Sequence, residues 1–257
     1  MNEQRFACTK CGKCCYGWLP LTIADALSHA HRFPLVVMLT PVRSGSKSFN
    51  IVKRTGFVLP LSRSKSFAVR ISPLAYVPPA MPCPALGPDN LCSIQNEKPA
   101  RCRALPFSPM FEETEQARLL KPKSGWECDT GPDAPVIYKD QKIIDRADFD
   151  LERNQVEQDA TVLRKYGQWI VDSMPDVRAQ LERAAKRLDS GYVLLNFTTL
   201  ISRLPNVDMF DFAERQLPVM RAFAARVSGN PDMLDYLEHY LTAGAHLHGL
   251  LKGRSMS

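Results

Sequence analysis

The sequence of 257 residues has no cysteine after residue 128, although eight cysteines precede that point. It also lacks any apolar run close to the roughly 20 residues that a membrane-spanning helix needs. The longest candidate, residues 33–42, is too short and contains two prolines. No apolar segment of a secretory signal peptide follows Met1-Asn-Glu-Gln-Arg5. These absences predict a cytoplasmic protein that does not span a membrane.

Several common catalytic motifs are also missing. The sequence contains no Gly-x-Gly-x-x-Gly, no P-loop, no His-Glu-x-x-His and no Gly-x-Ser-x-Gly. A Rossmann-type methyltransferase is therefore not indicated. The five histidines are scattered, and His246 and His248 cannot share one helix face because they are two residues apart. We expect the histidines to lie at the surface or at helix ends and not to bind a metal.

Positive charge is concentrated in the first half of the chain. Residues 1–130 contain 17 basic and 9 acidic residues, whereas residues 131–257 contain 16 and 18. Nucleic acid and membranes are not expected partners, while a protein substrate or partner and the oligomeric state stay open. Five basic residues flank cysteines, and we expect them to offset the negative charge of a metal–thiolate centre: Lys10, Lys13, Lys98, Arg101 and Arg103. For the other basic residues, solvation is the expected role.

The densest chemical feature is the block Cys8-Thr-Lys-Cys11-Gly-Lys-Cys14-Cys15. A disulfide framework is not expected, because a reducing compartment keeps thiols reduced or supplies them to metals. A Cys-x2-Cys turn lets two sulfurs converge on one ion while backbone N–H groups point at the thiolates. Gly12 can take the positive φ that such turns often need. The block therefore predicts metal ligation.

Spacing alone does not identify the metal. Cys8-x2-Cys11-x2-Cys14 has the spacing of the three-cysteine run of bacterial ferredoxins, in which a remote cysteine completes a 4Fe–4S cluster. The usual Cys-Pro continuation of that run is missing, and so is the second Cys-x2-Cys of a zinc ribbon. An iron–sulfur cluster is slightly favoured over zinc. The eight cysteines could fill two four-sulfur sites, or one site plus other thiols.

The other cysteines follow a proline-rich stretch. Residues 73–88 contain six prolines and should form an ordered loop that brings Cys83 toward the first block. A turn at residues 87–90 should let Cys83 and Cys92 approach each other like two arms of a hairpin. The predicted metal ligands are Cys8, Cys11, Cys14, Cys15, Cys83, Cys92, Cys102 and Cys128.

The residue patterns predict an α+β fold in two parts. Residues 1–135 should form a small, irregular, cysteine-rich metal-binding domain, with strands at 33–41, 49–59 and 66–71. Residues 136–257 should be all-helical, with helices at 145–174, 175–188, 192–203, 207–227 and 231–251. The helical part could be a scaffold or could form a groove for a substrate or partner.

Cys-x2-Cys-x2-Cys-Cys, followed far along by Cys83-Pro84 and Cys92-x9-Cys102-Arg103, resembles the YkgJ family of cysteine-cluster proteins. That family is described as a zinc- or iron-chelating domain, and it includes the flagellin lysine N-methylase. The resemblance covers roughly residues 6–130. The seven cysteines from Cys8 to Cys102 match the family pattern, and Cys128 matches a later family cysteine. The resemblance implies metal binding but does not identify the metal.

Three hypotheses for function follow. The first is a metal-binding protein, with an iron–sulfur cluster or zinc, that transfers electrons or holds a small substrate. The second is a lysine N-methylase-like transferase, by family analogy alone. The third is a structural zinc module that presents a surface to a partner. A further hypothesis places Arg103 near the centre, where its guanidinium would donate to a thiolate sulfur or a nearby carbonyl.

Overall fold

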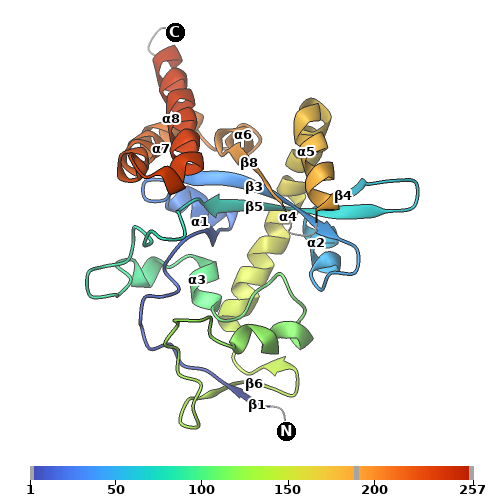
Figure 1. Cartoon of the computed structure of the whole chain (residues 1–257), viewed down its shortest axis with the longest axis vertical. Helices are drawn as coiled ribbons and strands as arrows, with labels where there is room; N and C mark the ends of the chain where they lie inside the picture. The colour runs from blue at the N-terminus through green and yellow to red at the C-terminus, as the bar shows by residue number, and fades with distance from the viewer. Residues whose placement is uncertain (1–2, 188–190, 255–257) are drawn as a thin grey trace. The chain divides into compact units, whose positions relative to one another are not determined.

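The computed structural model describes residues 3–187 and 191–254, and it confirms an α+β fold (Figure 1). The chain divides into two compact units that are each discontinuous in sequence. Unit 1 consists of residues 1–15, 39–71 and 85–193, and unit 2 of residues 16–38, 72–84 and 194–257. The predicted domain boundary near residue 135 stays a prediction.

Two sheets hold the strands. The smaller has the antiparallel order β1-β6-β7, formed by Glu3–Arg5, Val136–Lys139 and Lys142–Ile143. The larger has the order β2-β5-β3-β8, and β4 also pairs with β5. Its strands are β2 (Leu19–Pro20), β3 (Leu35–Arg43), β4 (Phe57–Pro60), β5 (Ser66–Ala75) and β8 (Val193–Asn196). Strands β3 and β5 contribute residues to both units.

Most predicted helices are present. Unit 1 contains α2 (Phe49–Thr55), α3 (Ala100–Ala104), α4 (Ala147–Ser173), α5 (Pro175–Lys186) and the 3-10 helices η1 (Gln95–Glu97) and η2 (Glu113–Leu120). Unit 2 contains α1 (Ile23–Ser28), α6 (Thr198–Ile201), α7 (Met209–Val227), η3 (Pro231–Met233) and α8 (Leu234–Arg254). The predicted end of α5 at Leu188 lies outside the described residues.

Two local predictions were wrong. Residues 49–59 form α2 followed by β4, because the buried pair Ile51 and Val52 fits one face of a short helix that ends at Gly56. Residues 192–203 form β8 and α6 instead of one helix, so residues 136–257 are not all-helical. A short apolar run suits a buried strand as well as a buried helix, and in both places the packing of the chain decided.

The core of unit 1 lies beneath its small sheet and along α4. Five buried side chains form one cluster: Phe107, Leu120, Tyr138, Ile143 and Phe149. Further along α4, Gly167 sits against the strands, since a Cβ there would lie 2.6 Å from Ile71 Cδ1. One face of the β4–β5 pair is therefore covered by α4.

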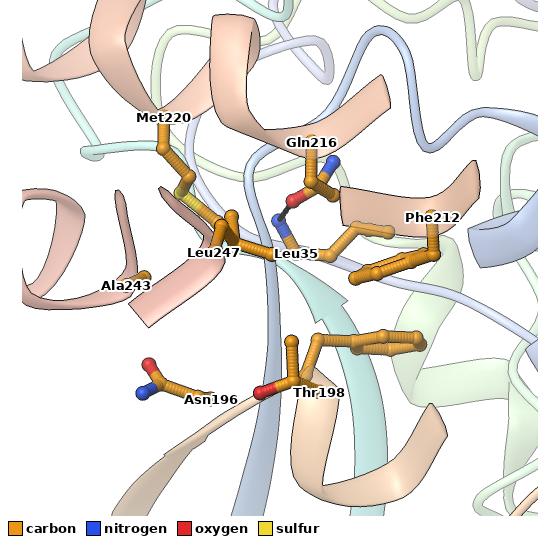
Figure 2. A pocket seen from close by; sticks show the side chains of 9 residues that line it. Leu35, Asn196, Thr198, Phe212, Gln216, Met220, Ala243 and Leu247 are labelled. Carbon is orange, nitrogen blue, oxygen red and sulfur yellow. Dashed lines mark hydrogen bonds between the residues drawn. The ribbon is translucent and has the colours of Figure 1, made fainter. Parts of the chain in front are cut away.

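In unit 2, helices α7 and α8 pack along each other (Figure 1). The fully buried amide of Gln216 joins α7 to the chain that leads into β3 (Figure 2). Its Oε1 accepts a hydrogen bond from the Leu35 N–H at 3.1 Å. Its Nε2 donates to Phe33 O at 2.7 Å and also to Ala30 O. Gln216 thus satisfies three buried backbone groups, and it lines a small pocket with Thr198.

We expect Gln216→Met to destabilise the protein by about 3 kcal/mol. It keeps the side-chain volume similar but leaves one buried N–H and two buried carbonyls without hydrogen-bond partners. Urea unfolding followed by circular dichroism would measure the loss. The matched control is Gln168→Met, which changes an exposed glutamine on α4 and should alter stability by less than about 0.5 kcal/mol. Equal losses of stability in the two variants would show that the hydrogen bonds of Gln216 do not stabilise the fold.

An aromatic cluster in unit 2 surrounds His239. Tyr76 stacks on Tyr236 with ring centroids 4.3 Å apart, and His239 meets the edge of Tyr76 at 5.3 Å. The buried Nε2 of His239 has no hydrogen-bond partner among the described residues. Burial therefore lowers the pKa of His239 to about 4. Desolvation causes this shift, and no charged group is among its causes.

The depressed pKa of His239 makes stability depend on pH. Below about pH 6.5 His239 binds a proton in the unfolded chain, whereas in the folded chain it stays neutral down to about pH 4. We expect stability to fall by up to about 3 kcal/mol as pH drops through this window. His239→Phe should flatten this dependence, whereas His246→Phe, at an exposed position, should not. Chemical unfolding at several pH values would test it, and parallel pH curves for both variants would contradict it.

Candidate metal centre

The first cysteine block is a loop held by tight turns. Gly12 has φ of +73° and Lys10 has φ of +60°, so the prediction of positive φ at Gly12 is confirmed. The Cys15 N–H donates to Gly12 O at 2.9 Å and closes a turn over Cys14. Neither helix nor strand restrains residues 8–15, which leaves several thiols near the surface.

A short backbone ladder places Cys128 beside this block. The Ala7 N–H donates to Asp129 O at 2.7 Å, and the Asp129 N–H donates back to Ala7 O at 3.0 Å. The Thr9 hydroxyl donates to Glu127 O at 2.9 Å. Residues 7–9 and 127–129 therefore run side by side, within unit 1.

The electrostatics of the thiols show which sulfurs are neighbours. Burial, followed by the charges of Cys11, Cys8 and Cys14, raises the pKa of Cys128. Thiolates repel one another in this way only when they lie close together. We call Cys8, Cys11, Cys14 and Cys128 the four-cysteine group, because the charges of the first three act on the fourth.

Hydrogen bonds favour the thiolate form at two members of this group. The N–H of Lys13 and then that of Glu127 lower the pKa of Cys11. The Cys14 and Cys15 sulfurs lie 4.0 Å apart, and this contact is the main reason why the pKa of Cys14 falls to about 6. The charge of Lys98 acts in the same direction on Cys14. Backbone N–H groups directed at thiolates are typical of metal-binding cysteine turns.

The second cysteine block forms the predicted turn. The Gly87 N–H donates to Leu91 O and the Ser93 N–H to Ala85 O, each at 2.8 Å, so residues 85–93 fold into a narrow hairpin. This hairpin touches the first block, because a Cβ on Gly12 would lie 3.3 Å from Asn90 Cβ. A Cβ at residue 12 would require Asn90 to shift by a few tenths of an ångström, and the positive φ at this position also favours glycine.

Helix α3 carries Cys102 and is fixed to α4 by charge. Arg101 Nη1 lies 3.1 Å from Glu152 Oε2, and both side chains are almost fully buried. Among the described residues the Oε2 atom has no hydrogen-bond partner, so its contact with Arg101 is one between charges. Arg101 Nη2 donates to Phe107 O. Burial lowers the pKa of Arg101, and the charges of Glu152 and then Cys102 oppose that effect.

The five basic residues predicted to offset the thiolates have different environments. Lys98 acts on Cys14 as expected, whereas the carboxylates of α4 engage two of the others. Arg103 Nη2 lies 2.6 Å from Asp148 Oδ1, with both side chains about half exposed. The hypothesis that Arg103 donates to a thiolate or to a carbonyl is therefore wrong, because α3 turns this side chain toward α4.

We expect Arg103→Ala to retain metal as tightly as the parent and to lose less than about 1 kcal/mol of stability, as is usual for an exposed ion pair. Competition with a chelator would measure metal retention. Asp148→Ala should behave alike, since it removes the other half of the same ion pair. A tenfold or greater loss of metal affinity in Arg103→Ala but not in Asp148→Ala would show that Arg103 supports the metal centre.

Residues 7–129 match a family model named CxxCxxCC, whose description reads "Putative zinc- or iron-chelating domain". Residues 7–129, slightly less than half of the chain, are similar to this cysteine-cluster family. The matched range includes all eight cysteines, from Cys8 to Cys128. No curated protein and no solved structure matches the chain. Metal binding through the cysteines therefore rests on the family together with the thiol geometry.

The cysteine side chains of the described residues do not enclose a metal site. No disulfide joins cysteines in the described part of the chain. Among residues 3–187 and 191–254, no three His, Cys, Asp or Glu side chains are arranged around one point as metal ligands. The donor chemistry of the thiols fits zinc or iron. No helix among the described residues is long and apolar enough to span a membrane.

The roles of α3 and α4 could not be inferred from the sequence. Arg101 is only one of several basic residues beside cysteines, and Glu152 is one of many acids in a long helix. Arg101 and Glu152 pair because of how α3 packs against α4. The prediction that all eight cysteines are metal ligands stays a prediction.

Proposed function

We propose that Cys8, Cys11, Cys14 and Cys128 hold one 4Fe–4S cluster. The observation that carries this proposal is the ladder between residues 7–9 and 127–129, which sets a remote cysteine beside a three-cysteine run. In bacterial ferredoxins a cluster takes three ligands from such a run and a fourth from far along the chain. The repulsion that raises the pKa of Cys128 agrees with the same grouping.

The chain's own residues would make this centre suitable for electron transfer or for holding a small substrate. A bound cluster would supply one-electron chemistry, with a potential that depends on charge and on hydrogen bonds to sulfur. The N–H groups of Lys13 and Glu127 already point at Cys11, and Lys98 is positioned to offset negative charge near Cys14. Exposed sulfurs at Cys8 and Cys14 keep the group accessible to a partner.

Metal analysis of protein purified without oxygen would test the proposal. We expect a brown protein with about four iron and four sulfide per cluster. Colourless protein with stoichiometric zinc would overturn the cluster and favour a structural zinc module built on the same four thiols. Protein that contains no metal, and takes up neither iron nor zinc on reconstitution, would overturn the metal centre altogether.

A further inference from the structure

The side chain of Arg70, on strand β5, is partly buried and carries an Nε atom that is unsatisfied within the described part of the chain. The Nε atom of Arg70 is buried, and no acceptor among the described residues pairs with it. Burial lowers the pKa of Arg70, and no carboxylate offsets that effect. A desolvated charge normally costs several kcal/mol unless it is paired. In this respect Arg70 differs from Arg101, which has Glu152.

Strand register places a second unsatisfied group opposite Arg70. The Tyr76 N–H donates to Pro34 O at 2.8 Å, so the end of β5 meets the start of β3 and the two neighbouring strands run antiparallel. Counting six residues inward along both strands from this pair sets Thr40 opposite Arg70. Directly opposed residues in an antiparallel pair share one face. The buried Oγ1 of Thr40 also lacks a hydrogen-bond partner among the described residues.

The same face carries small apolar side chains. In the β4–β5 register, Val58 lies opposite Ala68, which is two residues before Arg70 and therefore shares its face. Val58 is 40% exposed, an unusually open position for a valine in a strand. The other face of the pair carries Phe57 and Ile71 and is covered by α4. The Nε of Arg70, the Oγ1 of Thr40 and the exposed Val58 side chain thus share one face of the sheet, on which Ala68 is fully buried.

We infer that Thr40 and Arg70 form a binding site for the carboxylate or phosphate group of a small ligand. The planar guanidinium can donate two parallel hydrogen bonds to such a group, and the Thr40 hydroxyl can donate a third. Val58 would contact a short apolar body attached to the anionic head. The site is independent of the cysteine centre and would bind its ligand whichever metal the cysteines hold.

Ligand-induced stabilisation tests the site on the full chain. Thermal unfolding would be recorded in chloride, inorganic phosphate and butyrate at equal ionic strength. We expect butyrate or phosphate to raise the midpoint above that in chloride, with millimolar affinity, because binding to the folded state alone stabilises it. A response to butyrate alone assigns a carboxylate ligand, and a response to phosphate alone assigns a phosphate ligand. No rise with either anion would overturn the inference.

Three variants make the test specific. Arg70→Met keeps the length of the side chain, removes the charge and should abolish the anion response. Without anion it should be at least as stable as the parent, because replacing a buried unpaired charge with an apolar group relieves its desolvation cost. Thr40→Val should weaken binding about five- to tenfold through the loss of one hydrogen bond. Arg63→Met, at an exposed arginine between β4 and β5, is the matched control and should respond like the parent.

Either of two results with Arg70→Met would contradict the inference. One is an anion response of Arg70→Met that equals that of the parent. The other is a folded Arg70→Met that is clearly less stable than the parent in chloride, since this would show that the guanidinium already has a stabilising partner. If Arg63→Met also lost the response, the anions would be acting through surface charge in general, and the site would be rejected.

Discussion

We expect Cys11→Ser and Cys128→Ser to lose the same metal centre, although the two cysteines lie at opposite ends of the family domain. Each variant should fall short of the parent by one full centre per chain, because a four-thiolate site that loses one ligand no longer holds its metal firmly. Metal content would be measured after anaerobic purification and dialysis against a chelator. The physical reason is the ladder that places residues 127–129 beside residues 7–9.

The double variant Cys11→Ser/Cys128→Ser decides whether the two thiols share a centre. If they do, it should lose no more metal than either single variant, since residues in one site are not additive. Cys92→Ser is the matched control, because Cys92 belongs to the hairpin beside Gly12 but not to the four-cysteine group. The double variant Cys11→Ser/Cys92→Ser should lose as much metal as the two single variants lose together. Additive losses for Cys11 and Cys128 would show that they serve different centres.

A second large effect is expected at the buried ion pair beneath α3. Glu152→Gln should destabilise the protein by about 3–5 kcal/mol, because it leaves the buried guanidinium of Arg101 without a counter-charge. Urea unfolding would measure this loss in the metal-free protein, so that a change in metal binding cannot account for it. Part of the effect should reach Cys102, which α3 carries directly beside Arg101.

Two further variants give the ion pair its controls. Asp148→Asn removes the carboxylate of the half-exposed Arg103 pair one turn away on α4 and should cost less than about 1 kcal/mol. The double variant Arg101→Met/Glu152→Met should recover much of the stability lost in Glu152→Gln, since an apolar pair can replace a buried ion pair. If Glu152→Gln cost no more than Asp148→Asn, the charge contact would not be what fixes α3 on α4.

The sequence determined the features that depend on local chemistry. The spacing of Cys8, Cys11 and Cys14 around Gly12 indicated a metal-binding turn, and the structure has positive φ at Gly12. The turn at residues 87–90 followed from its glycine, proline and asparagine, and the long helices followed from apolar periodicity and from Pro175 at a first turn. Each of these signals is contained within a few residues, so no knowledge of the rest of the chain was needed.

The tertiary structure decided every feature that depends on which distant segments meet. Residues 192–203 became a strand and a short helix because a neighbouring strand was available to pair with an apolar run. Cys128 joined the first block through backbone bonds that carry no sequence signature. For the same reason Arg103 pairs with Asp148, and no carboxylate in the described part of the chain offsets the burial of Arg70. Side-chain partners are set by the packing of elements, whereas a turn or a helix is set largely by its own residues.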